Sequence, residues 1–306
     1  MLFDIHRLCW DQKLLDLLNI PQSMLPQVLP SGSFFGNTTL NGAEIPITGI
    51  AGDQQSALFG QGCFNDGDIK NTYGTGCFLL ANTGNRPVFS DNGLLTTLAA
   101  TLEGEKTEYA LEGSVFVGGA VVQWLRDELK FIEKASDSEA VAMSVSDSGG
   151  VYVVPAFSGL GAPYWDMDAR GTITGITRGT GKAHIVRAAL ESIAFQTDDL
   201  IRAMEADMGR RLTALKVDGG ASENRFLMQF QADISGLDVV RASTAEATAL
   251  GAALIAGLTV GYYRDRASVS EMLSSAAAFS PGMDADRRAE LLTGWKCAVA
   301  SCRFRG

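Results

Sequence analysis

Two glycine-rich turns carry the residues of this sequence that are best suited to chemistry. The first, Gly52-Asp53-Gln54-Gln55, leads into a segment with the apolar spacing of a helix. A carboxylate at a helix N-terminus is favoured in its ionised form by the partial positive charge there. Asp53 could then accept a proton from a substrate, as a general base does. The ordinary alternative is that Asp53 only caps the helix.

The second turn spans residues 73–78, reads Tyr-Gly-Thr-Gly-Cys-Phe, and lies between two strand-like segments. Glycines at such a bend let the backbone approach a ligand, and the turn offers amide groups and one hydroxyl to phosphate oxygens. A tight turn without a ligand is the ordinary alternative. A carboxylate that takes a proton and a loop that holds a phosphate are together the minimum for phosphoryl transfer to an alcohol.

The elements that position these turns are predicted to be of the α/β class. Residues 46–51 are apolar and uncharged, which predicts a buried strand directly before Asp53. Strand-like runs between 66 and 112 predict an antiparallel meander. A helix is expected from 115 to about 131, with Gly118 and Gly119 in its first turns, where each glycine costs about 1 kcal/mol.

The second half of the chain alternates strands, turns and helices, which is typical of α/β proteins. A glycine-rich turn, Asp218-Gly219-Gly220, stands before a helix N-terminus, a common place for anions to bind. The residues after 268 are expected to form helices. The predicted helices in this half cover 183–208, 223–234 and 245–262, and the strands cover 212–217 and 237–242.

Six segments together resemble the carbohydrate kinases of the FGGY family and, within it, the glycerol kinases. They are GIAGDQQSALFGQ, NTYGTGCFLL, EGSVFVGGAVVQWLRDE, GLGAPYWDMDARGTITGITRGT, VDGGASENRFLMQFQ and EATALGAALIAGL. The resemblance implies a ribonuclease-H-like α/β fold of the actin/hexokinase superfamily, with a mixed sheet flanked by helices. It divides the chain into a remnant of an N-terminal domain with its connector (1–40), a C-terminal kinase domain (41–265) and C-terminal helices (266–306).

The resemblance also assigns roles to individual residues. Asp53 is expected to be the base and to bind glycerol with Gln54 and Phe78. Magnesium is expected to bind the phosphates of ATP, with no metal ligands predicted in the protein. The residues expected to bind ATP or ADP are Gly74, Thr75, Gly119, Gln123, Gly220 and Asn224.

Composition excludes several classes of partner. The chain has 306 residues with a net charge of −10, which argues against nucleic acid and anionic membranes. Its longest apolar run is shorter than the ~20 residues of a membrane span. Five cysteines without paired spacing favour a reduced, cytoplasmic protein. The resemblance adds a homo-oligomer as the expected state of a full-length protein.

Three functions remain open on the sequence. The first is a glycerol kinase, the second a non-catalytic remnant that binds a nucleotide or a partner, and the third a kinase for another polyol or sugar of the family. Glycerol kinases carry an Asp-x-Gly-Thr-type phosphate loop near their start, and we find no equivalent in this sequence. We therefore expect the 306 residues alone to be inactive, because phosphoryl transfer depends on groups positioned from both walls of a cleft.

Overall fold

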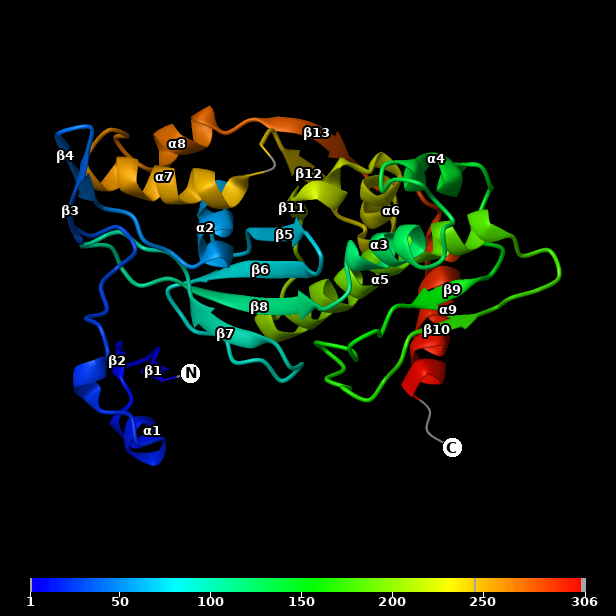
Figure 1. Ribbon diagram of the computed structural model, residues 1–306, viewed down its shortest axis with the longest axis horizontal. Coiled ribbons are helices and arrows are strands. Elements are labelled where there is room, and N and C mark those ends of the chain that lie inside the picture. Colours follow the sequence, from blue (N-terminus) through cyan, green and yellow to red (C-terminus); the bar gives the residue numbers. More distant parts are fainter. Residues whose placement is uncertain (1, 245, 304–306) are drawn as a thin grey trace.

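A seven-stranded mixed sheet runs through the centre of the computed structural model, which describes residues 2–244 and 246–303 (Figure 1). Three neighbouring strands, β12, β11 and β5, are parallel, and β13, β6, β8 and β7 extend the sheet antiparallel on either side. The strand order is β13-β12-β11-β5-β6-β8-β7. The strands are β5 (Ile69–Tyr73), β6 (Cys77–Gly84), β7 (Leu95–Leu98), β8 (Tyr109–Val115), β11 (Ala214–Asp218), β12 (Asp238–Ala242) and β13 (Ser275–Phe279).

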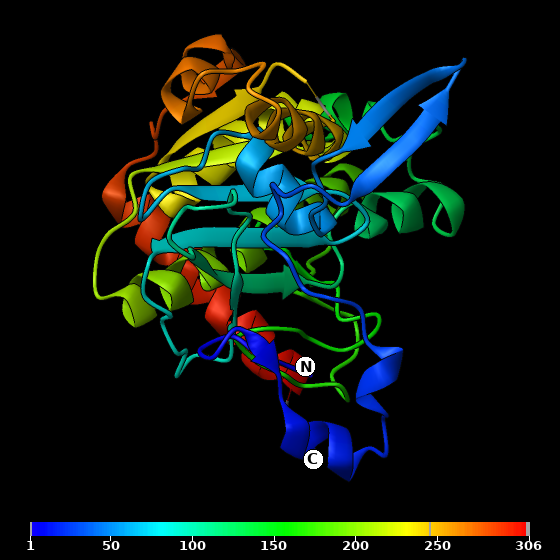
Figure 2. The same cartoon turned by 90° about the vertical axis from the view of Figure 1, so that its left-hand side faces the viewer.

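Helices cover both faces of this sheet. α5 (Lys182–Met208) and α6 (Arg225–Ser235) pack on one face and enclose the main hydrophobic core. α2 (Asp53–Gly60) and α7 (Ala247–Thr259) pack on the other face and lie in front of the strands in Figure 2. The sequence therefore correctly predicted an α/β protein with a mixed sheet and flanking helices.

The two helices α2 and α7 approach each other very closely. The Ser56 hydroxyl donates to the carbonyl of Thr248 over 2.7 Å. A Cβ atom added to Gly60 or Gly251 would collide with the backbone of the other helix. The small residues of α7 therefore hold α2, which begins with Asp53, in a fixed place against the sheet.

The segment before α2 corrects the first sequence prediction. Residues 46–51 do not form a buried strand: β4 (Ala43–Ile47) pairs only with β3 (Gly36–Leu40), and this hairpin projects from the body (Figure 2). Ile50, beyond it, is 52% exposed. An apolar run predicts that a segment is extended but not which neighbour it pairs with, and here the hairpin partner is local.

Three further features differ from the prediction: where a helix starts, the order of the strands and the number of strands in the sheet. β8 continues to Val115, and α3 (Ala120–Asp127) begins only after Gly118 and Gly119, so neither glycine stands inside a helix. β8 lies between β6 and β7, so these strands do not form a simple meander. β13 adds a strand to the sheet where only helices were expected. In each case pairing across the sheet decides the outcome, and local pattern does not reveal it.

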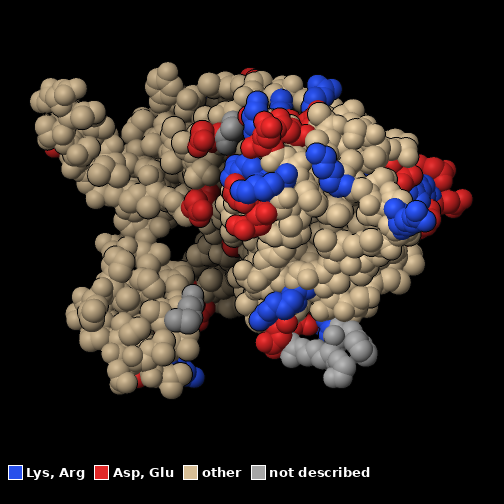
Figure 3. All heavy atoms as spheres, turned by 45° about the vertical axis from the view of Figure 1, so that its right-hand side comes forward, with Lys and Arg blue, Asp and Glu red and all other residues tan. Residues whose placement is uncertain are grey.

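The remaining elements lie around the sheet. The N-terminal segment lies below the sheet in Figure 1. On the face shown in Figure 3, basic and acidic side chains lie next to one another, and neither sign forms a continuous patch. Within residues 2–244 and 246–303, no helix is long and apolar enough to cross a membrane. These elements are β1 (Phe3–Asp4), β2 (Cys9–Trp10), α1 (Gln12–Leu17), η1 (Gln22–Met24), α4 (Asp137–Met143), β9 (Tyr152–Val154), β10 (Thr172–Thr174), η2 (Gly220–Glu223), α8 (Arg266–Met272) and α9 (Ala285–Arg303).

Candidate functional site

A cavity of about 470 Å³ opens where β5 and β11 end and α3, α4 and α6 begin. All six residues expected to bind a nucleotide line it, although they are spread over 150 positions of the sequence. They are Gly74, Thr75, Gly119, Gln123, Gly220 and Asn224. Carboxyl ends of parallel strands are where α/β proteins bind their ligands, and β5 and β11 are parallel neighbours.

The wall of the cavity at residues 74–76 is held by backbone hydrogen bonds to the start of α3. Gly119 donates its amide to the carbonyl of Gly74 over 2.8 Å, and Gly118 donates to that of Thr75 over 2.8 Å. A Cβ atom at Gly119 would stand 2.7 Å from the Gly74 carbonyl oxygen. Gly118 and Gly119 are thus required by close packing against residues 74–77, which shapes the turn that faces the cavity.

The opposite wall is the turn after β11. Gly219 has φ +87°, and a Cβ atom there would stand 2.6 Å from the carbonyl oxygen of Tyr73. The next residue, Gly220, has open space around its Cβ position. A side chain at Gly220 would therefore enter space beside the cavity, whereas Gly219 ties this turn to the end of β5.

Asn224 lines the cavity and also caps the N-terminus of α6. Its side-chain oxygen accepts from the amide of Leu227 over 2.9 Å and caps α6, and its Nδ2 donates to the hydroxyl of Ser138 over 3.3 Å. The sequence analysis missed Arg126, Ser138 and Glu139, which also line the cavity. The last two lie on α4, whose polar, acidic sequence gave no signal beyond a short helix.

The cavity fits a nucleotide. Its volume lies within the roughly 300–1,000 Å³ that small-molecule sites occupy. Glycine turns that leave room for a ligand, one arginine and several polar side chains line it, which suits a ligand with phosphate and a purine. Among the described residues, no group of three or more histidine, cysteine or acidic side chains could hold a metal ion.

The residues expected to bind the acceptor gather on the α2 side of the sheet. Asp53 is exposed at the first position of α2, after Gly52, and its Oδ2 accepts from Gln54 Nε2 over 3.1 Å. Phe78 lies on β6 and is 36% exposed. Lys70 joins them, since its Nζ donates to Gln54 Oε1 and to the Phe78 carbonyl over 3.2 Å. The structure thus brings Asp53, Gln54 and Phe78 together around a lysine that the sequence analysis missed.

Lys70 is fully buried at 0% exposure, and burial lowers its pKa to about 8 despite the attraction of Asp218. Burial likewise raises the pKa of Glu112 and of Asp218, while Lys70 opposes the shift in each. Lys70 could have been noticed in the sequence only as a single charge inside a short strand, Ile69–Tyr73, and a charged residue in a strand is usually a sign of an edge position. In the structure Lys70 is instead a buried residue of a central strand, and it is hydrogen-bonded to Gln54 and Phe78.

The two groups of residues meet at the ends of β5 and β11. Thr72 on β5 accepts from Lys70 Nζ over 3.0 Å and donates its hydroxyl to Asp218 Oδ1 over 2.7 Å. Asp218 ends β11 and begins the turn that carries Gly220 into the nucleotide cavity. The acceptor residues and the cavity are therefore joined by a short chain of side chains.

The loop from 155 to 170 contributes no residue to the large cavity or to the hydrogen bonds of Lys70. Tyr164 donates its hydroxyl to Asp199 on α5 over 2.8 Å, and Trp165 donates Nε1 to the Gly93 carbonyl over 2.7 Å. These two hydrogen bonds hold the loop against α5 and against the segment before β7.

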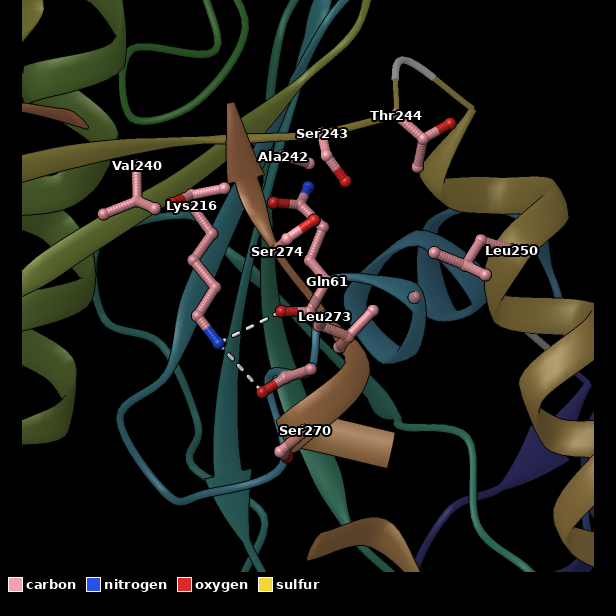
Figure 4. Close-up of a pocket in the computed structure, with 13 residues that line it drawn as sticks. Gln61, Lys216, Val240, Ala242, Ser243, Thr244, Leu250, Ser270, Leu273 and Ser274 are labelled. Atoms are coloured by element: carbon pink, nitrogen blue, oxygen red, sulfur yellow. Dashed lines mark hydrogen bonds between the residues drawn. The ribbon is translucent and has the colours of Figure 1, made fainter. Parts of the chain in front are cut away.

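A second cavity of about 270 Å³ lies between β11, β12, α7 and α8 (Figure 4). Lys216 reaches across it and donates to the backbone carbonyls of Gln61, over 3.0 Å, and Gly62, over 2.9 Å. The Gln61 side chain donates Nε2 to Asp218 Oδ1 over 3.0 Å. None of the residues expected at the site lines this cavity, so it is not the candidate site.

Two family models match most of the chain. The C-terminal domain model of the FGGY family of carbohydrate kinases matches residues 69–260, and the N-terminal domain model of that family matches residues 1–60. The chain belongs to the FGGY family. The fold is accordingly that of the FGGY kinases, an actin/hexokinase-like ATPase fold with a mixed sheet and flanking helices.

The relatives include several glycerol kinases. The chain is 60% identical to a glycerol kinase of Symbiobacterium thermophilum over 305 residues, and 59% identical to one of Clostridium botulinum over 301 residues. These alignments cover 99% and 98% of the chain but 61% and 60% of the relatives, so the chain spans about three fifths of their length.

Two solved kinase structures superpose closely on the chain. The glycerol kinase of Plasmodium falciparum with ADP is 40% identical with a TM-score of 0.94, and the alignment covers 100% of this chain and 62% of that one. A xylulose kinase of Lactobacillus acidophilus, 22% identical with a TM-score of 0.83 over 98% of this chain and 61% of that one, shares the fold.

Proposed function

We propose that the protein to which this chain belongs phosphorylates glycerol with ATP and forms sn-glycerol 3-phosphate. The observation that carries the proposal is that the six residues expected to bind the nucleotide line one cavity, and that hydrogen bonds through Lys70, Thr72 and Asp218 connect its glycine turn to Gln54 and Phe78. The 60% identity to a glycerol kinase supports glycerol as the acceptor. It also favours this activity over a non-catalytic role.

In the proposed reaction Asp53 accepts the proton of one glycerol hydroxyl. That oxygen forms a bond to the terminal phosphorus of ATP, and the bond from that phosphorus to ADP breaks. Gln54 donates to one carboxylate oxygen of Asp53, and this fixes the direction in which the carboxylate faces. The ring of Phe78 offers an apolar surface to the carbon chain of glycerol. A base positioned in this way contributes roughly 10²–10⁴-fold to the rate.

The nucleotide residues hold the other substrate. We propose that the turn with Gly74 and Thr75, and the start of α3 with Gly119 and Gln123, contact the phosphates. Gly220 and Asn224 contact the adenosine. Magnesium would neutralise charge on the phosphates, and it usually keeps several water ligands and needs few protein ligands.

The test is a phosphorylation assay of the native protein with ATP and a set of acceptors. We expect kcat/KM for glycerol to exceed the values for xylulose and gluconate by at least ~10²-fold, because a site that hydrogen-bonds its own acceptor disfavours others. A better rate with xylulose or gluconate would assign another acceptor of the family. Nucleotide binding without transfer to any acceptor would replace the enzyme with a non-catalytic binding protein.

We also propose that the native protein is a cytoplasmic homo-oligomer. All five cysteines are unpaired, which is usual in a reducing compartment. The hairpin β3–β4 projects with exposed Leu40, Ile45 and Ile47, and exposed apolar groups of this kind often contact a second copy. Sedimentation velocity of the native protein tests this; a monomer at micromolar concentration would contradict it.

A further inference from the structure

Lys70 lies where two rows of side chains on the sheet meet. Because side chains alternate along a strand, Ile69 and Asn71 face the core under α5, and Lys70 and Thr72 face α2. Lys70 is the register partner of Lys216 on β11, and Thr72 is the partner of Asp218. The α2 face of the sheet thus carries two lysines side by side, of which only Lys70 contacts the acceptor residues.

All three hydrogen bonds of the Lys70 ammonium group go to oxygen atoms of the site. They reach Gln54 Oε1 on α2, Thr72 Oγ1 on the same strand and the Phe78 carbonyl on β6. An ammonium group has three N–H donors and no acceptor, so these bonds use its whole capacity. Since Lys70 occupies Gln54 Oε1, the amide nitrogen of Gln54 is left to face Asp53. Removing any of these three acceptors would be costly, because it would leave a donor of a buried ammonium group without a hydrogen bond.

Lys70 is also linked, through Thr72 and Asp218, to the turn that lines the nucleotide cavity. Thr72 accepts from Lys70 and donates to Asp218, and Asp218 accepts a second bond from Gln61 Nε2. Asp218 immediately precedes the turn with Gly219 and Gly220. A chain of hydrogen bonds therefore runs from the Asp53 carboxylate through Gln54, Lys70 and Thr72 to the start of the glycine turn.

We propose that Lys70 is a positioning residue that aligns Asp53 and Gln54 and links them, through Thr72 and Asp218, to the glycine turn of the nucleotide cavity. This inference rests on the proposed function for its kinetic consequence. Because Lys70 is buried and donates all three of its hydrogen bonds within the protein, we assign it no contact with either substrate. It acts by fixing the Gln54 amide, and through it the direction in which Asp53 faces the acceptor.

The charge of Lys70 gives this proposal a pH signature. Lys70 is surrounded by Asp218, Cys63, Glu112 and Asp53, and burial outweighs the attraction of these groups. Above a pH of about 8 the neutral amine has only two N–H donors for three acceptors. The alignment of Gln54 should then weaken, and the rate should fall. In the unfolded chain Lys70 keeps its proton to about pH 10.4.

The test compares Lys70→Met with Lys216→Met in the native protein. Both variants remove a lysine from the same face of the sheet, but the Lys216 ammonium group donates to the carbonyls of Gln61 and Gly62 and not to Gln54, Thr72 or Phe78. We expect Lys70→Met to lower kcat for glycerol at least tenfold, to change KM for ATP less than twofold and to lose the fall in rate above pH 8. Lys216→Met should keep both the rate and the pH profile. A Lys70→Met enzyme with kcat within twofold of wild type and an unchanged pH profile would overturn the proposal.

Hydrogen exchange of the 306-residue chain gives a readout that needs no activity. We expect Lys70→Met to speed exchange at least tenfold in peptides that cover the start of α2 and the 218–220 turn, since both lose their common support. Lys216→Met should affect the peptide with Gln61 and Gly62 instead. Equal exchange in wild type and Lys70→Met at both segments would overturn the proposed link. If wild type phosphorylates no acceptor, the proposed function fails, and this measurement still decides the role of Lys70.

Discussion

Asp53 is the carboxylate on which the proposed chemistry depends. It stands at the first position of α2, accepts one hydrogen bond from Gln54, and lies on the side of the sheet where Lys70 and Phe78 meet. We predict that Asp53→Asn lowers kcat of the native enzyme at least ~10²-fold and leaves KM for ATP nearly unchanged, because the amide cannot take the proton. Steady-state kinetics with glycerol and ATP measure both values.

Asp286→Asn is the matched control for this variant. Asp286 is also an exposed aspartate in the first turn of a helix, here α9, far along the chain from the site. It should keep the wild-type rate. If Asp53→Asn retains more than a tenth of wild-type kcat, Asp53 is not the base.

Some residues that line the large cavity were predictable where a turn motif places them. Gly74 and Gly220 each stand in a glycine-rich turn after a strand, and the family resemblance added Gln123 and Asn224. Asp53 stays a prediction, because the buried strand expected before it does not form. Lys70 was not predictable, because its role comes from pairing across three strands and a helix. A lysine in a strand has no pattern of its own that distinguishes a buried, fully paired ammonium from an exposed one.

At the scale of elements, local sequence predicted most helices and the strands that they follow. The long helix expected at 183–208 is α5 at Lys182–Met208, and the strand expected at 237–242 is β12. The failures are at 46–51, 115–131 and the C-terminal segment with β13. In each, a partner distant in sequence or a local hairpin decides the structure, and periodicity describes only the segment itself.

Asp199 lies where α5 packs against the 155–170 loop and α9, and its pKa differs strongly from that of an exposed aspartate. Asp199 accepts from Tyr164 and from Trp295 Nε1, both over 2.8 Å. Burial raises its pKa to about 7, although these two hydrogen bonds oppose the shift. In the unfolded chain the group titrates near 3.9. The folded state therefore holds the proton more tightly between these two pH values.

This shift predicts how stability depends on pH. The contribution of Asp199 is fully present below about pH 4 and is lost as pH rises to about 7, by on the order of 2–4 kcal/mol. We predict that Asp199→Asn removes this fall, because the amide oxygen accepts the same two bonds and carries no charge. Urea unfolding from pH 4 to pH 8 measures the difference between the two proteins. An equal pH dependence in wild type and Asp199→Asn would contradict the assignment.

At the scale of the whole molecule, the nucleotide cavity joins parts of the chain that are far apart in sequence. The turn after β5, the start of α3, α4 and the turn after β11 all line it. A ligand that binds only this folded arrangement must stabilise the whole chain, by about 2.7 kcal/mol at a concentration 100 times Kd. The entropy of unfolding increases with chain length, so each kcal/mol raises the Tm of a large protein by only a few degrees. The gain of about 2.7 kcal/mol therefore corresponds to a rise in Tm of several degrees.

The last prediction uses this effect to test the cavity in the 306-residue chain. Gly220 has open space at its Cβ position and lines the cavity, so Gly220→Leu should place a side chain in the nucleotide site without disturbing the fold. We expect ADP to raise Tm of wild type by several degrees and of Gly220→Leu by less than a third of that. Gly179→Leu, at an exposed glycine outside the cavity, is the control and should keep the full shift. Calorimetry with increasing ADP measures all three. A full shift in Gly220→Leu would show that the nucleotide binds elsewhere, because a leucine in the cavity and a purine or phosphate cannot share the same space.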